Sequence, residues 1–283
     1  MKTLLAFLVF VVALARGHHD NIDRTQELKR GFNIPDDIPD LFGRVHDFPE
    51  YIIYNGYEAA EGSAPYIVSL ETHNGTHTFV CGGSIIGDNW ILTAAHCLTN
   101  RISAKIFYGS NYYGKSEISH TVGKENLIYH ELFNPSISFS FDIGLIRTPR
   151  IEFTDKISKI ALIHFIDGDD KLVGLNTKSC GWGYFRGTVR PERLQCMNVN
   201  VISNEECDKR HIVSIYDDML CTGRIDGKAV CDGDSGGPLV TLSNPPILVG
   251  VNTFNERFCD GDSGYARVSF YLKWIQQITG IVN

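Results

Sequence analysis

The chain has 283 residues, of which 43% are hydrophobic and 11% are aromatic, so it can bury a core in one large domain or two small ones. Its formal net charge is −7, and no block of lysines and arginines is present. These two features argue against a general nucleic-acid binder, which carries a basic surface.

The N-terminus has the pattern of a secretory signal peptide. Met1-Lys2 is followed by an apolar run from Leu4 to Leu14 and then by Ala15-Arg16-Gly17. The run fits the about 7–15 apolar residues of a signal peptide, and neither it nor any later run reaches the about 20 residues that span a bilayer. We therefore expect a signal peptide over residues 1–17, a secreted, extracellular protein and no membrane partner.

Residues 18–52 are polar and acidic. Pro35, Pro39 and Pro49 interrupt any periodic pattern there, and nothing in the segment supports a core. Such a composition is typical of a propeptide or flexible leader.

From Ile53 onwards, short apolar runs alternate with turns rich in glycine, asparagine and aspartate. The runs occupy residues 66–70, 84–86, 90–92, 104–108, 197–202 and 247–251. This spacing of short strands predicts an all-β barrel or sandwich. Only residues 270–278, near the C-terminus, have apolar side chains at helical spacing.

The Asn74-Gly75-Thr76 triplet lies in a polar stretch between predicted strands, which makes Asn74 a candidate N-glycosylation site.

A serine near the C-terminus is surrounded by glycines and acids, in the segment Cys231-Asp232-Gly233-Asp234-Ser235-Gly236-Gly237-Pro238. The backbone amides of Gly233 and Ser235 can point at one oxyanion, as acyl transfer requires. The same segment also satisfies the G-x-S-x-G elbow of α/β-hydrolases. An α/β-hydrolase needs its histidine after the serine, and no histidine lies beyond His211. The order of the residues therefore excludes the elbow.

The base must then lie before the serine in the chain. Leu92-Thr93-Ala94-Ala95-His96-Cys97 offers a histidine, and the apolar run 141–146 contains Asp142. A buried aspartate costs several kcal/mol unless it is paired, and an imidazole N–H is a suitable partner. The order His96, Asp142, Ser235 is that of the chymotrypsin-type catalytic triad.

With these three segments, Cys81-Gly82-Gly83-Ser84, Cys180-Gly181-Trp182-Gly183 and the terminal helix, the chain from about Ile53 resembles the trypsin/chymotrypsin (S1) family of serine proteases. The resemblance implies an S1 domain over residues 53–283. Its fold would be two six-stranded antiparallel β-barrels with a C-terminal α-helix and the active site between the barrels. It also implies a monomer without cofactor or metal, with protein or peptide substrates, an activating protease and protein inhibitors as partners.

Secretion makes disulfides the expected state of the eight cysteines. The resemblance implies the pairs Cys81–Cys97, Cys207–Cys221 and Cys231–Cys259. The family cysteine at the position of Cys180 usually pairs with one shortly after the nucleophile, where this chain has Thr241. By parity we expect Cys180–Cys196, across a hairpin. A zinc site is disfavoured because no two cysteines show C-x₂-C spacing.

The resemblance also assigns the chemistry. Ser235 would attack the scissile carbonyl, His96 would transfer its proton to the leaving amine, and Asp142 would hold the imidazole tautomer. The amides of Gly233 and Ser235 would stabilise the oxyanion. Asp234 would pair with a new N-terminus at Ile53 that activating proteolysis creates.

The activation site departs from the family, which usually has Arg or Lys before that isoleucine, because here Ile52 precedes Ile53. Two routes remain open: an activating enzyme that tolerates an apolar residue, or stepwise trimming from Arg44 or Tyr51. The alternative function is a protease homologue that is never activated and acts as a binding or regulatory protein. We favour a serine endopeptidase because the triad is complete.

The residue six positions before the nucleophile sets the primary specificity of this family, and here it is Ala229. The resemblance places Thr253, Phe254 and Asn255 on one wall of the pocket and Ser263 on the other, with Asn255 narrowing the entrance. Burying a substrate charge against alanine costs several kcal/mol, so we expect a neutral, non-tryptic preference. A shift of one residue in this alignment would instead bring Asp262 into the pocket and favour basic residues.

The run from Asn55 to Val68 resembles insect chymotrypsin-like proteases of the Jonah type, which are largely digestive. Digestion of bulk protein is therefore the expected role, and a regulatory role with one target is the alternative.

Overall fold

The computed structural model describes residues 56–164, 171–184, 190–210, 213–224, 229–255, 259 and 261–282. The predicted signal peptide, the leader and Ile53 lie outside these ranges. No helix among the described residues is long and apolar enough to cross a membrane.

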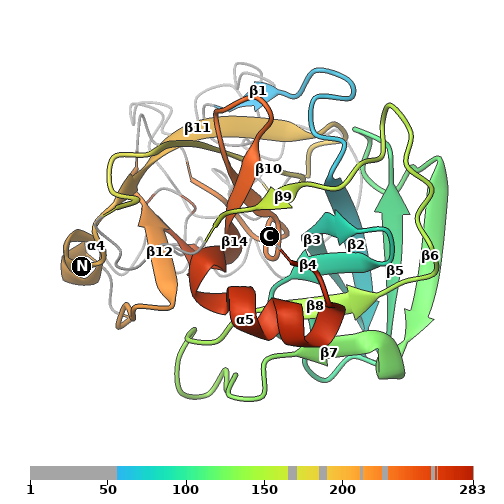
Figure 1. Cartoon of the computed structure of the whole chain (residues 1–283), viewed down its shortest axis with the longest axis horizontal. Coiled ribbons are helices and arrows are strands. Elements are labelled where there is room, and N and C mark those ends of the chain that lie inside the picture. The colour runs from blue at the N-terminus through green and yellow to red at the C-terminus, as the bar shows by residue number, and fades with distance from the viewer. Residues whose placement is uncertain are drawn as a thin grey trace, which may run out of the picture. The chain divides into compact units, whose positions relative to one another are not determined.

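Seven antiparallel strands form the first sheet, in the order β6-β5-β2-β3-β4-β8-β7. Its strands are β2 (Ile67–His73), β3 (Thr78–Gly87), β4 (Trp90–Thr93), β5 (Ser103–Tyr108), β6 (Ile118–Gly123), β7 (Leu127–Tyr129) and β8 (Gly144–Arg147). The two edge strands, β6 and β7, are connected only by the short 3₁₀ turn η1 (Lys124–Asn126). This turn therefore joins the two edge strands of the sheet to each other in the chain (Figure 1).

The second sheet has the strand order β1-β11-β10-β13-β14-β15-β12, and β11 also pairs with β12. Its strands are β1 (Tyr57–Glu58), β9 (Ala161–Leu162, parallel to β14), β10 (Asn176–Gly181), β11 (Gln195–Ile202), β12 (Met219–Thr222), β13 (Pro238–Thr241), β14 (Ile247–Asn255) and β15 (Ser263–Arg267). The β11–β12 pairing closes a ring of six strands. The predicted architecture of two β-barrels with a C-terminal helix is therefore confirmed, with the second barrel closed as a ring of six strands and the first left open as a half-barrel of seven strands.

The burial of the strands follows from their residue patterns. In β11, Met197, Val199 and Val201 are buried while Asn198 and Asn200 between them are exposed, as expected for a strand with one face on the core. All residues of β4 are buried, and this strand is paired with β3 on one side and with β8 on the other.

In the part of the chain that the structure describes, three α-helices accompany the sheets: α3 (Ala95–Leu98), α4 (Asn204–Arg210) and the C-terminal α5 (Val268–Thr279). Helix α5 extends the predicted helix by a few residues and buries Tyr271 and Ile275. It ends at Gly280, whose φ of 72° is the left-handed conformation that glycine adopts without strain.

Candidate active site

His96 and Asp142 come together because of the pairing of β4 with β8. These strands are antiparallel, with Thr93 opposite Gly144. His96 follows β4 on helix α3, and Asp142 precedes β8, so both residues lie at the same edge of the first sheet.

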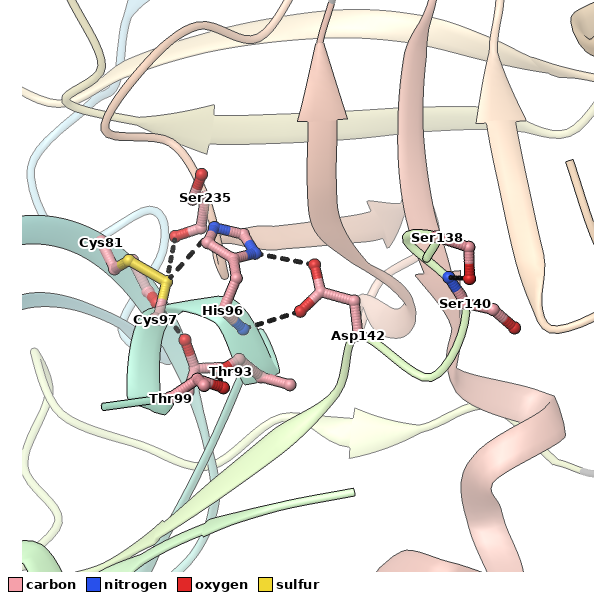
Figure 2. A network of polar contacts seen from close by, with 11 residues as sticks. Cys81, Thr93, His96, Cys97, Thr99, Ser138, Ser140, Asp142 and Ser235 are labelled. Atoms are coloured by element: carbon pink, nitrogen blue, oxygen red, sulfur yellow. Dashed lines mark hydrogen bonds and ion pairs between the residues drawn. A yellow bond between two sulfur atoms is a disulfide. The ribbon is translucent and has the colours of Figure 1, made fainter. Parts of the chain in front are cut away.

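Asp142 accepts two hydrogen bonds from His96. The His96 backbone N–H donates to Oδ1 at 2.8 Å, and Nδ1 lies 2.7 Å from Oδ2 (Figure 2). Because a carboxylate can only accept, Nδ1 carries the proton and Nε2 is left as the basic nitrogen. Asp142 is fully buried, so this pair satisfies a charge that would otherwise be costly.

The same pair determines the protonation of His96. Burial lowers the pKa of the imidazole, but the charge of Asp142 and the hydrogen bond to it raise the pKa more. The pKa of His96 therefore lies above its ordinary value of 6.5. Asp142 therefore stabilises the imidazolium form of His96.

A buried carboxylate from the second barrel holds the loop that carries Asp142. Asp218, just before β12, accepts hydrogen bonds from the Phe141 N–H at 2.6 Å and from the Ser140 hydroxyl at 2.9 Å. The hydroxyl of Tyr271 on α5 also donates to it. Phe141 has a φ of 61°, a left-handed conformation that such an anchor can maintain in a bulky residue. The sequence analysis missed Asp218 and predicted only a helix over residues 270–278, which contain Tyr271, because no local pattern signals this contact.

Ser235 lies beside His96, and the Cys81–Cys97 disulfide is in contact with both. Cys97 Sγ lies 3.7 Å from His96 Nε2 and 3.7 Å from the Ser235 carbonyl oxygen. Gly82 donates its N–H to that carbonyl at 2.7 Å, which ties β3 to the serine segment. The Ser235 hydroxyl makes no hydrogen bond in the described part of the chain, and Figure 2 shows it projecting away from the imidazole.

The segment around Ser235 requires glycine. Gly233 has a φ of 99° and Gly236 a φ of 78°, both in the region that residues with a Cβ avoid. A Cβ on Gly236 would lie 2.1 Å from Thr93 Oγ1. The sequence pattern therefore reflects both backbone conformation and close packing against β4.

Asp234 is buried and bonded to two backbone amides. Gly183 donates its N–H to Oδ1 at 2.7 Å, and Cys231 donates its N–H to Oδ2 at 2.9 Å. Burial raises the pKa of this carboxyl to about 6, although both hydrogen bonds act in the opposite direction. A Cβ on Gly181 or Gly183 would lie 2.0 or 2.4 Å from the carboxylate, which explains both glycines of that motif. Its expected partner, Ile53, lies outside the described residues.

The four expected pocket residues lie on the second barrel. Ala229, Thr253 and Ser263 are buried, and Asn255 is partly buried at the end of β14. The Val230 N–H donates to Ser263 Oγ at 3.3 Å, so Ser263 faces the segment that contains Ala229. This contact agrees with the alignment that places Ser263, and not Asp262, in the wall of the pocket.

Asp262, the residue of the alternative alignment, is bound elsewhere. Its carboxylate accepts the Arg224 N–H at 2.8 Å and forms an ion pair with Arg210 of α4 at 3.3 Å. The pairing neutralises the negative charge that would favour a basic substrate side chain.

All four disulfides join the expected cysteines: Cys81–Cys97, Cys180–Cys196, Cys207–Cys221 and Cys231–Cys259. Cys81, Cys97 and His96 are close enough to resemble a metal site, but both sulfur atoms are already bonded to each other. Cys180 lies opposite Cys196 on adjacent strands. Thr241 lies opposite Thr177 on β10 and not opposite Cys180.

Asn74 lies in the turn between β2 and β3. Its Oδ1 accepts the N–H groups of Thr76 and His77 at 3.1 and 2.9 Å, and the segment 75–78 is exposed. The turn is therefore accessible, and glycosylation of Asn74 stays a prediction.

Comparison with known proteins gives the family. The sequence profile of the family "Trypsin" matches residues 53–275. Serine protease 1 of Drosophila melanogaster is 38% identical over 251 residues, which cover 87% of this chain and 90% of that protein. Collagenase of Hypoderma lineatum is 36% identical over 243 residues, 84% of this chain and 91% of that protein. The solved structure of HL collagenase aligns with a TM-score of 0.73 and 35% identity over 82% of this chain and 100% of that chain. The chain belongs to the trypsin family of serine proteases, which are endopeptidases.

Proposed function

We propose that the protein is a secreted endopeptidase that hydrolyses peptide bonds with Ser235 as nucleophile, His96 as base and Asp142 as orienting carboxylate. The observation that carries the proposal is the pair of hydrogen bonds between His96 and Asp142 next to Ser235. These bonds leave Nε2 free to take the serine proton. Rotation of the Ser235 side chain toward Nε2 completes the arrangement.

In this mechanism Ser235 Oγ attacks the scissile carbonyl while its proton passes to His96 Nε2. The imidazolium then gives the proton to the leaving amine, and water releases the acyl group by the reverse sequence. The amides of Gly233 and Ser235 hold the oxyanion, and one such donor lowers the barrier by about 3–4 kcal/mol.

Three segments are proposed from the sequence: a signal peptide over 1–17, a propeptide over 18–52 and the protease domain over 53–283. Cleavage before Ile53 would supply an ammonium group for the buried carboxylate of Asp234. The raised pKa of Asp234 supports this role, because burial outweighs the opposing effects of its two amide hydrogen bonds and of the Arg190 charge, so a nearby ammonium group would stabilise the carboxylate.

The activation experiment uses a fluorophosphonate probe, which labels an activated serine, before and after limited proteolysis. Labelling that needs cleavage before Ile53, located by N-terminal sequencing, supports a zymogen. The Ser235→Ala variant is the control and should remain unlabelled. Failure of the cleaved protein to react with the probe or to hydrolyse a peptide panel would favour the alternative function, a non-activated binding homologue. The unbonded Ser235 hydroxyl and Ile52 are the observations that keep this alternative in consideration.

For specificity we propose a neutral side chain on the acyl side of the scissile bond. Ala229 offers no charge, and Asp262 is paired with Arg210. A panel of peptides that differ only in the residue before the scissile bond tests this, and strong cleavage after Arg or Lys would contradict it.

A digestive role is proposed from the resemblance of residues 55–68 to insect digestive proteases. Abundance of the protein in gut tissue is the expected finding. Expression confined to another tissue would favour the regulatory role.

A further inference from the structure

An open cavity of about 350 Å³ lies next to Ser235 and is distinct from the pocket of Ala229. Its walls come from residues 78–81 of β3, from His96, Cys97 and Arg101, and from residues 184, 190, 232, 233 and 235. None of Ala229, Thr253, Asn255 or Ser263 lines it.

This placement identifies the part of a substrate that the cavity receives. On the proposed function, the side chain before the scissile bond occupies the Ala229 pocket and its carbonyl carbon lies at Ser235. The residues after the bond must then leave along the other side of Ser235. The cavity borders His96, which protonates the leaving amine, so it is the site for the leaving-group side of the substrate.

Two arginines line the cavity. Arg101 is held by three contacts: its guanidinium lies 3.7 Å from the centre of the Phe79 ring, Nη1 donates to the Thr99 carbonyl at 3.0 Å, and Nε donates to Thr72 Oγ1 at 3.3 Å. It forms no ion pair with any described residue. Arg101 therefore presents a fixed positive charge whose Nη2 is available to a ligand.

Arg190 is fixed by aromatic stacking. Its guanidinium lies 4.3 Å from the ring centres of both Tyr113 and Tyr184. Nη2 lies 3.7 Å from the position that a Cβ on Gly233 would take, beside the oxyanion segment. Nη1 is buried and has no hydrogen-bond partner among the described residues. A buried, unpaired donor of this kind is costly, and a ligand carboxylate would satisfy it.

The charge around the cavity is unusual for this chain. The protein as a whole carries a formal charge of −7, yet among the described residues that line the cavity Asp232 is the only acidic one, against two arginines. Asp232 is exposed and forms no ion pair with either arginine in the described ranges. Glu71, which accepts the Tyr113 hydroxyl at 3.3 Å, is not part of the lining.

We infer that this protease selects substrates with acidic side chains just after the scissile bond, which bind between Arg101 and Arg190. A purely structural role for the arginines would stabilise their aromatic neighbours and leave substrate choice unaffected. The inference rests on the proposed function, and the test below is designed so that failure of the inference can be told apart from failure of the proposed function.

The test uses peptides with one neutral residue before the scissile bond and Glu, Ala or Lys at the two positions after it. We expect kcat/KM to be about 3–10-fold higher for Glu than for Ala, and lower for Lys, as for a partly exposed charge pair. Arg101→Gln and Arg190→Gln should each reduce the ratio of kcat/KM for the Glu peptide to kcat/KM for the Ala peptide. Arg190→Lys, which keeps the charge, should retain most of this preference for Glu. The ratio should also fall as salt increases.

Arg150→Gln is the matched control. Arg150 is exposed, and its one ion pair within the described ranges is with Glu152 at 3.7 Å, so its loss should leave the ratio unchanged. Equal cleavage of the Glu and Ala peptides, or equal effects of Arg150→Gln and Arg190→Gln, would overturn the inference while leaving the proposed function intact.

A second measurement does not depend on turnover. Fluorescence anisotropy measures the binding of the same peptides, carrying a fluorescent label, to the Ser235→Ala variant. The affinity should decrease in the order Glu, Ala, Lys. If the activated protein cleaves no peptide, the proposed function is wrong. The order of binding affinities then decides by itself whether the cavity prefers acidic side chains. Equal affinities for the three peptides would refute it.

Discussion

Asp218 accepts the backbone N–H of Phe141 at 2.6 Å, one residue before Asp142. Asp218 precedes strand β12 of the second barrel, whereas Asp142 precedes strand β8 of the first. The position of Asp142 is thus held by the other barrel, and by α5 through the hydroxyl of Tyr271.

Tyr271→Phe removes one donor to this buried carboxylate. We expect the free energy of unfolding to fall by about 1–3 kcal/mol, the cost of an unsatisfied buried group. We also expect kcat to fall with little change in KM, because the loop contacts Asp142 and not the substrate. Urea unfolding and steady-state kinetics measure the two effects. Tyr129→Phe, on an exposed side chain, is the control, and an unchanged kcat in Tyr271→Phe would contradict the positioning role.

The pH dependence of hydrolysis should follow His96. Only the neutral imidazole accepts a proton from Ser235, so kcat/KM rises with pH as His96 loses its proton. Because Asp142 raises the pKa of His96, the midpoint of this rise should lie above pH 6.5.

Asp142→Asn removes the charge that raises this pKa and should lower kcat about 10⁴-fold through loss of the correct tautomer. The imidazole pKa, followed by NMR on the Ser235→Ala background, should fall in the same variant. A midpoint below 6.5 in the wild type, or an unchanged pKa in Asp142→Asn, would contradict the assignment.

Asp234 should make the uncleaved chain less stable as pH rises. Burial raises its pKa to about 6 in the folded chain, above the ordinary value of 3.8. The folded state then binds the proton more tightly, so its contribution to stability is present below pH 3.8 and is lost as pH rises through about 6.

Urea unfolding at pH 4 and pH 7.5 should show this loss, roughly 1–3 kcal/mol, in the protein but not in Asp234→Asn. Both proteins carry Ser235→Ala to prevent self-cleavage. Because they differ only at position 234, the contributions of all other titrating groups to the pH dependence cancel in the comparison. Cleavage before Ile53 should abolish the difference by pairing the carboxylate. Identical pH dependence in the two uncleaved proteins would contradict the prediction.

The Cys180–Cys196 disulfide closes a loop with a sequence separation of 16. Removing it by the double substitution Cys180→Ser and Cys196→Ser should lower the free energy of unfolding by about 3 kcal/mol, mainly through the entropy of the unfolded chain. Denaturant unfolding measures the loss. A decrease below about 0.5 kcal/mol would show that the β10–β11 pairing alone provides this stability.

Some of the site could be predicted from the sequence because it depends on local chemistry. The glycines around Ser235 satisfy a backbone conformation, and a buried Asp142 needs a donor wherever it lies. The position of His96 before Ser235 in the chain, with no histidine after the serine, excluded an α/β-hydrolase. The alternation of short apolar runs likewise predicted strands, and the apolar spacing near the C-terminus predicted α5.

The contacts between distant segments could not be predicted in this way. The bond from Asp218 to Phe141 spans 77 residues, and the stacking of Arg190 on Tyr113 joins the two sheets' connecting loops. The register that places Thr241 opposite Thr177, and the pairing of Asp262 with Arg210, were also settled by the fold.

The sequence by itself determined the chemical groups and their order along the chain, because these depend on residue type and near neighbours. The tertiary structure alone decided which charges are paired, which are anchored and which face the substrate. Those properties depend on strand register and loop packing, which bring together residues whose separation in the sequence carries no information about their distance in space.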